Sequence, residues 1–137
     1  MTDCIFCKIV AGEIPSSKIY EDDQILAFLD ITQVTPGHTL VIPKKHVRNI
    51  PDMDGQEAGL LFSRIPKIAR HLTDKLGAQG LNVLSNSEAA AGQTVFHTHI
   101  HLLPRFEEGD GLKISFELQD PDVDKLTQLA EQLYLEV

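Results

Sequence analysis

The stretch His97-Thr98-His99-Ile100-His101-Leu102-Leu103 places three histidines at every second position of an apolar segment. Successive side chains of a strand point to opposite faces, so a strand over residues 95–106 would carry all three imidazoles on one face. Three readings of this pattern are open. It could be a surface strand, a metal site in which His-x-His binds zinc, or a catalytic group with one attacking imidazole. The apolar residues Leu102, Leu103 and Phe106 argue against the surface strand.

The segments before this strand predict an α+β fold with a mainly antiparallel five-stranded sheet, one central helix and one C-terminal helix. Shorter strands are predicted at 19–20, 25–29, 38–43 and 81–84, because apolar runs there are separated by polar or Pro-Gly turns. We expect one domain spanning residues 1–137, since the chain has the length of an ordinary domain.

Two helices are expected from a three- and four-residue apolar period. The central helix follows a capping pair, Asp54 and Glu57, and Gly77 fits its C-cap, while Pro66 should kink it. The second helix is expected to begin at Asp120-Pro121. The apolar residues inside that helix are Val123, Leu126, Leu129 and Leu133.

Composition excludes several classes of function. No apolar run approaches the ~20 residues that cross a bilayer, and no secretory signal precedes Cys4, so a cytoplasmic location without membrane partners is expected. The formal net charge is −8, which argues against binding to nucleic-acid polymers. A small phosphorylated ligand is still compatible with this charge, because its site needs only local donors.

The histidine stretch resembles the signature of the histidine triad (HIT) family, His-φ-His-φ-His-φ-φ, in which φ is hydrophobic; Thr98 departs from it mildly. Further blocks resemble the family in the same order along nearly the whole chain. They are Ile5–Ile9, Glu21–Asp23, Ala27–Ile31, Pro36–His38, Val41–His46 and Gly92–Val95. The resemblance implies a HIT-like fold and a homodimer, for which we expect the central helix and the strand at 81–84 to form the interface.

The resemblance also implies the catalytic residues. His99 would attack the α-phosphorus of a nucleotide, with its Nδ1–H held by the backbone carbonyl of His97. His101 would donate to the phosphoryl group and His38 would support the cluster. Neutral imidazole is populated and nucleophilic near neutral pH. The implied reaction proceeds through a nucleotidyl-histidine intermediate and releases a nucleoside monophosphate.

Substrate-binding residues follow from the same resemblance, with a purine nucleotide as the expected substrate. The positions expected to bind phosphate are Asn86, Gly92, Gln93 and Thr94. Asp30 matches the position that binds the ribose hydroxyls. The apolar residues expected around the base are Phe6, Ile9, Phe28, Leu29 and Ile31, which would look the same if they were plain core.

The pair Cys4 and Cys7 has three possible roles: a redox pair, two free thiols, or half of a tetrahedral zinc site. A redox pair is disfavoured because only three residues precede Cys4, too few for the strand that precedes such a motif. The resemblance implies that His46 and His97 complete a closed, structural Zn²⁺ site.

The sequence does not decide between the two substrate classes of the family. Asn86 resembles the branch that cleaves nucleoside phosphoramidates, whereas Gly92–Val95 and Leu103–Arg105 look more like the branch that splits dinucleoside polyphosphates. The alternative function is a nucleotide-binding or zinc-clamped interaction protein with vestigial catalysis. A hydrolase whose triad holds a catalytic metal is a third class, which would need an open coordination position and a nearby acidic base.

Overall fold

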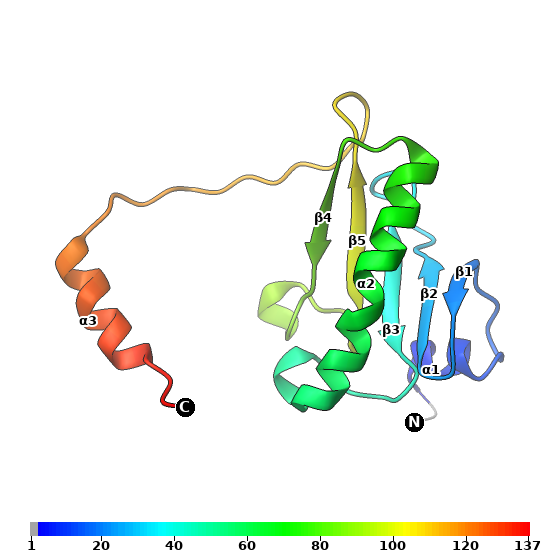
Figure 1. The fold of residues 1–137 in the computed structure, drawn as a ribbon, viewed down its shortest axis with the longest axis horizontal. Helices are drawn as coiled ribbons and strands as arrows, with labels where there is room; N and C mark the ends of the chain where they lie inside the picture. Colours follow the sequence, from blue (N-terminus) through cyan, green and yellow to red (C-terminus); the bar gives the residue numbers. More distant parts are fainter. Residues whose placement is uncertain (1–2) are drawn as a thin grey trace.

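A five-stranded, wholly antiparallel sheet with the order β1-β2-β3-β5-β4 forms the centre of the molecule (Figure 1). The structure is a computed structural model, and it describes residues 3–137. The strands are β1 (Lys18–Glu21), β2 (Ile25–Leu29), β3 (Thr39–Pro43), β4 (Gly80–Leu84) and β5 (Ile100–Arg105). The predicted α+β class and antiparallel sheet are confirmed.

Each face of the sheet is covered by a helix. The long helix α2 (Gly55–Leu76) buries Leu61, Ile65, Ile68 and Leu72 against one face. The short helix α1 (Ile5–Val10) buries Phe6 and Ile9 against the other. Alternation along the strands supplies both cores, because Ile25 and Ala27 pack toward α2 while Leu26 and Phe28 pack toward α1. The sequence had not predicted α1.

Helix α2 has the ends that its sequence predicts. The Asp54 side chain accepts from the Glu57 backbone N–H, the Glu57 side chain accepts in return, and Gly77 ends the helix at φ 65°. The helix runs without interruption through Pro66, where a kink is predicted. Its buried apolar stripe on both sides of Pro66 compensates for the missing N–H. Within residues 3–137, no helix combines the length and apolar character needed to span a membrane.

Strand β5 is shorter than the predicted strand at 95–106. It begins at Ile100, so His97 and His99 lie in the irregular segment before it. The ladder ends there because β4 stops at Leu84, opposite His101, and β3 stops at Pro43, which has no N–H to donate. Residues 95–99 are fixed by other contacts, including Thr98, whose N–H and hydroxyl both donate to the carbonyl of Val47.

The chain leaves the sheet after β5 and does not return to it (Figure 1). Residues 107–122 are irregular, and α3 (Val123–Leu133) stands apart from the body of the molecule. The C-terminal helix is therefore confirmed, although its N-cap is Asp122. Two single-turn 3₁₀ helices complete the structure: η1 (Ile50–Asp52) and η2 (Ala89–Ala91).

Candidate active site and metal site

The triad histidines gather on the α1 side of the sheet. The edge of the Phe6 ring meets His97 and His99, with ring centroids 5.9 and 5.1 Å apart. The centroids of His99 and His101 are also 5.1 Å apart. The structure thus brings the three histidines to one face, although only His101 belongs to β5. Segment 95–99 and the first residues of β5 place them there together.

His99 is held in one tautomer by the backbone. Its Nδ1 lies 2.7 Å from the carbonyl oxygen of His97, and the carbonyl can only accept, so Nδ1 carries the proton. The other ring nitrogen, Nε2, therefore has a free lone pair. Burial lowers the pKa of His99, which keeps the ring neutral at physiological pH. A neutral imidazole with an unprotonated Nε2 is the form that can attack phosphorus.

A second chain of hydrogen bonds fixes the tautomers of His38 and His101. The backbone N–H of Val34 donates to His38 Nδ1 over 3.4 Å, so His38 carries its proton on Nε2. His38 Nε2–H donates a hydrogen bond to His101 Nδ1 over 2.9 Å, so the proton of the His101 ring is on Nε2. His101 Nε2 is buried and has no hydrogen-bond partner within residues 3–137. The relay thus ends in an N–H that needs an acceptor.

Burial keeps this relay neutral. It lowers the pKa of His101 to about 4 and also lowers the pKa of His38, where the nearby Asp30 only partly opposes it. Asp30, His38 and His101 have potential ligand atoms close enough for a metal ion. The facing nitrogens of His38 and His101 are, however, already joined by their own hydrogen bond. This arrangement favours acid–base and donor roles over a catalytic metal.

The expected nucleoside-binding residues fall into two groups. Phe6, Ile9 and Phe28 are only 4–7% exposed and pack in the core beneath α1, whereas Ile31 is 98% exposed. Leu29 is half-buried at the end of β2. Asp30 accepts from the N–H and the hydroxyl of Thr32 through Oδ1, and its Oδ2 lies 3.6 Å from His38 Nε2. Oδ2 faces the histidines, beside the exposed Ile31.

The expected phosphate-binding loop, residues 86–94, lies before the triad. Gly92 adopts φ 97°, a conformation that favours glycine, and the amide of Asn86 reaches over 3.5 Å to its carbonyl. Gly92 and Thr94 are exposed. Gln93 differs from the expectation, because it is only 3% exposed and both ends of its amide bond to the protein. Its side chain anchors the loop through these hydrogen bonds.

Gln93 belongs to a polar network that ties the loop to residues after β3. Its Nε2 donates to the carbonyls of Arg48 and Val95, and its Oε1 accepts from Glu88 N–H and from Asn49 Nδ2. The Glu88 carboxylate accepts two bonds from the Arg48 guanidinium, at 2.7 and 2.8 Å, and one from Asn49. Arg48, and then Asn49, lower the pKa of Glu88 to about 2. Glu88 has φ 75°, a strained conformation for a residue with a Cβ.

Sequence reasoning missed Arg48, Asn49 and Glu88. Their partners are about 40 positions apart along the chain, so no local spacing marks them. Three other basic side chains form ion pairs with carboxylates. Lys44 pairs with Glu21, Lys45 with Glu57, and Arg105 with Asp110.

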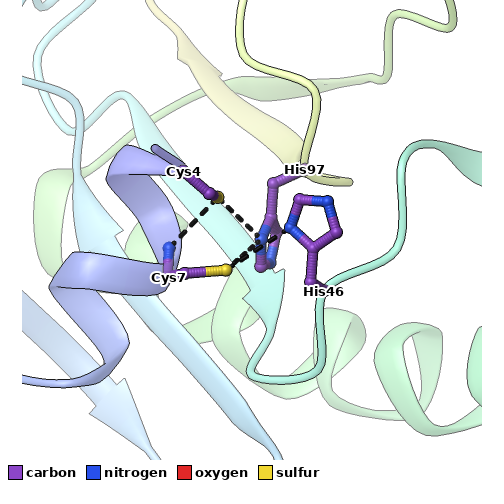
Figure 2. A group of neighbouring side chains, drawn as sticks. All are labelled: Cys4, Cys7, His46 and His97. Atoms are coloured by element: carbon purple, nitrogen blue, oxygen red, sulfur yellow. Dashed lines mark hydrogen bonds between the residues drawn. The ribbon is translucent and has the colours of Figure 1, made fainter. Parts of the chain in front are cut away.

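Four potential metal ligands converge beside the triad (Figure 2). Cys4 is the N-cap of α1, and its sulfur accepts from the Cys7 N–H over 3.2 Å, so the helix turn places both sulfurs on one side. His97 Nδ1 lies 3.4 Å from Cys4 Sγ and 3.6 Å from Cys7 Sγ, and His46 Nδ1 lies 3.4 Å from Cys7 Sγ. A helix does follow the first cysteine, but no strand precedes it within the described residues.

The spacing of these four residues fits a tetrahedral zinc ion. With zinc–sulfur bonds of about 2.3 Å and zinc–nitrogen bonds of about 2.0–2.1 Å, a tetrahedron separates sulfur from nitrogen by roughly 3.6 Å. His97 Nε2 donates to the Pro43 carbonyl over 2.8 Å, which leaves the Nδ1 lone pair directed at the sulfurs. Burial, followed by the neighbouring Cys4, raises the pKa of the Cys7 thiol to about 11, so without a cation Cys7 would stay protonated. The donor set therefore fits zinc, and His97 connects it to His99.

A family model, the HIT domain, matches residues 11–108, and this chain belongs to the HIT family. The Bacillus subtilis relative named Protein hit is 55% identical over 109 residues, which cover 80% of this chain and 75% of that protein. The Candida albicans relative, named Adenosine 5'-monophosphoramidase HNT1, is 39% identical and covers 95% of this chain and 88% of its own length. The Arabidopsis thaliana relative, named Adenylylsulfatase HINT3, is 41% identical, with 96% of this chain and 66% of that protein aligned.

A crystal structure of SMU.412c from Streptococcus mutans aligns over 97% of this chain and 84% of its own, with 59% identity and a TM-score of 0.94. Residues 107–137 are 31 of the 137 residues, so an alignment that covers 97% of the chain includes most of them. The aligned region therefore includes most of the segment that contains α3.

Proposed function

We propose that residues 1–137 act as one catalytic unit, a nucleotide hydrolase in which His99 is the nucleophile and His101 the principal donor. The hydrogen bond from His99 Nδ1 to the His97 carbonyl supports this most directly, because it leaves Nε2 free to attack. The unpartnered His101 Nε2 supports the donor role. Close relatives are named for hydrolysis of adenylyl compounds, which agrees with this chemistry.

The proposed reaction has two steps. In the first, the His99 Nε2 lone pair forms a bond to the α-phosphorus, the bond from phosphorus to the leaving amine or nucleotide breaks, and a leaving amine takes up one proton from the solvent. The His97 carbonyl stabilises the positive charge that develops on the ring. In the second, water attacks the same phosphorus and the phosphorus–nitrogen bond breaks. The water gives up its protons, neutral His99 is restored, and a nucleoside monophosphate leaves.

Binding contacts are proposed for the same site. Asn86, Gly92 and Thr94 supply donors to the phosphate, with Gln93 fixing the loop that carries them. Asp30 Oδ2 accepts from the ribose hydroxyls, and Ile31 and Leu29 contact a purine whose floor is formed by the buried aromatic residues. Cys4, Cys7, His46 and His97 would hold a structural zinc ion, which supplies folding energy and fixes the His97 backbone.

The substrate class is proposed as an adenylyl group joined to a nitrogen or sulfate leaving group, with dinucleoside polyphosphates as the alternative. The names of HNT1 and HINT3 favour the first class. The chain is further proposed to work as a cytoplasmic homodimer that pairs through α2 and β4. Exposed Val83 and Leu84 on the edge strand β4 support that interface.

The test compares wild type and His99→Ala on adenosine phosphoramidate and on diadenosine tetraphosphate. Turnover should nearly vanish in the variant, while nucleotide binding by calorimetry survives, because His99 acts in the chemical step. A chelator control separates a histidine nucleophile from a catalytic metal, since the metal enzyme stops at once. Wild-type turnover by His99→Ala on both substrates would overturn the proposal and favour an interaction protein.

A further inference from the structure

The loop between β2 and β3, residues 30–38, carries two of the residues at the proposed active site. Asp30 begins the loop and His38 ends it, and Asp30 Oδ2 lies 3.6 Å from His38 Nε2. His38 in turn bonds to His101, the proposed donor. The contacts that hold this loop therefore bear on the arrangement of protons in the site.

The hydrogen bond between the two rings does not by itself fix the direction of the relay. His38 Nε2 and His101 Nδ1 are 2.9 Å apart, and either nitrogen of a neutral ring can carry the shared proton. With that proton on His38, the ring proton of His101 lies on Nε2, which can then donate. With the shared proton on His101 Nδ1, the His101 Nε2 would be a bare acceptor. Only the first arrangement supplies the donor, and at this point the inference rests on the proposed function.

Two groups of the loop select the first arrangement. The Val34 N–H donates to His38 Nδ1, and the Asp30 carboxylate lies beside His38 Nε2. The bond from Val34 is 3.4 Å long and Val34 is 45% exposed, so a small movement of the loop would break this bond. The Asp30 carboxylate is held separately, because its Oδ1 accepts from the N–H and the hydroxyl of Thr32.

The side chain of Gln33 braces the loop beside Val34. Its Nε2 donates to the carbonyls of Asp30 and His38 over 2.6 and 2.7 Å, and its Oε1 accepts from the Gly37 N–H over 2.8 Å. Both amide protons and the amide oxygen are thus in use, and a rotated amide would bring a donor against the Gly37 N–H. Gln33 is exposed, so water competes for its amide, yet all three of its bonds return to the loop.

We infer that Gln33 is a positioning residue, which holds the Val34 N–H on His38 Nδ1 and thereby keeps the ring proton of His101 on Nε2. Two backbone bonds close the rest of the loop, from the Asp30 N–H to the His38 carbonyl and from the His38 N–H to the carbonyl of residue 35. Neither of them involves the peptide group that carries the Val34 N–H. The Gln33 side chain therefore joins that part of the loop to its two ends.

The test observes the ring protons by NMR. Two-bond ¹H–¹⁵N correlation spectra of the ¹⁵N-labelled full-length chain at neutral pH distinguish a protonated from an unprotonated nitrogen in each ring, and His38→Ala and His101→Ala assign the signals. Wild type should show protonated Nε2 and unprotonated Nδ1 on both rings. Gln33→Leu removes the amide, and Gln33→Glu turns an oxygen toward the two carbonyls, so both variants should shift both rings toward the opposite tautomer.

The matched controls are Gln56→Leu and Gln56→Glu, on the exposed first turn of α2, and their spectra should be those of wild type. Kinetics adds a second measurement. For Gln33→Leu, kcat should fall about tenfold, less than for His101→Ala, because part of the population keeps the donor. Nucleotide affinity by calorimetry should stay within about threefold of wild type, since Thr32 still holds the Asp30 carboxylate.

Wild-type tautomers in both Gln33 variants, or a proton on His38 Nδ1 in wild type, would overturn the inference even if His99 proves to be the nucleophile. Shifted tautomers with an unchanged kcat would also overturn it, because the relay would then not govern the reaction. If wild type hydrolysed neither substrate, the proposed function would fall, and the tautomers alone would decide whether Gln33 positions the relay.

Discussion

Replacing Gln93 with leucine should loosen the phosphate loop and destabilise the protein. The Gln93 amide makes four hydrogen bonds, two donated and two accepted, and the residue is only 3% exposed. Each bond contributes about 1 kcal/mol net, and a partner left buried without a bond costs about 1–3 kcal/mol. Part of this cost is relieved when the exposed loop opens to water. We therefore expect Gln93→Leu to lower the free energy of unfolding by about 2–4 kcal/mol.

Urea denaturation measures this change, with Gln56→Leu, on the exposed first turn of α2, as the matched control. Steady-state kinetics then separates an anchor from a phosphate contact. An anchor predicts lost stability together with weaker substrate binding and slower turnover, since the whole loop moves. A direct phosphate contact predicts a kinetic defect alone. If the unfolding free energy of Gln93→Leu stayed within about 0.5 kcal/mol of wild type, the network would not hold the loop.

Three further predictions concern the metal site, the carboxylate of Glu88 and the proposed donor His101. Gently purified protein should contain about one zinc per chain by elemental analysis, and Cys7→Ser should lower both zinc content and Tm; zinc-free wild type with an unchanged Tm would contradict this. The pKa of Glu88 is about 2 when folded and about 4.3 when unfolded, so its stabilisation is complete above pH 4.3 and is lost as the pH falls through about 2. Glu88→Gln should therefore be less stable than wild type at pH 7, and the gap should close in acid; a gap independent of pH would refute the assignment. His101→Ala should reduce kcat by about 10²–10³ with its fold intact by circular dichroism, whereas an unchanged kcat would remove His101 as the donor.

Local patterns in the sequence predicted most of the scaffold. The capping pair and Gly77 marked the limits of α2, and apolar runs bounded by turns located β2 and β3. Helix α1 was not predicted because its six residues are too few to show a helical period of apolar residues. The strand at 95–106 was predicted too long because the alternation of side chains begins at His97, before the backbone pairing of β5 begins at Ile100. Which segments pair is decided by neighbours such as Pro43, and these are distant in sequence.

In the site, too, local patterns were predicted and contacts between distant residues were not. The resemblance of the triad to a known signature pointed to side chains that the structure brings together, but not to the relay from Val34 through His38 to His101, because a backbone N–H has no sequence signature. Gln93 was expected to bind phosphate because it lies in the block Gly92–Val95, which resembles the family. In the structure its amide turns inward, where buried partners from the segment after β3 satisfy it. Three-dimensional contacts of this kind cannot be read from spacing.

Trapping the intermediate tests the central claim most directly. Wild-type enzyme mixed with excess adenosine phosphoramidate is quenched in base within milliseconds, because a phosphoramidate bond is labile in acid, and the digested protein is analysed by mass spectrometry. The account predicts a peptide that contains His99 and carries one adenylyl group, which disappears during the chase with water and is absent from His99→Ala. An adenylyl group on another residue, or hydrolysis that proceeds in His99→Ala, would contradict nucleophilic catalysis by His99.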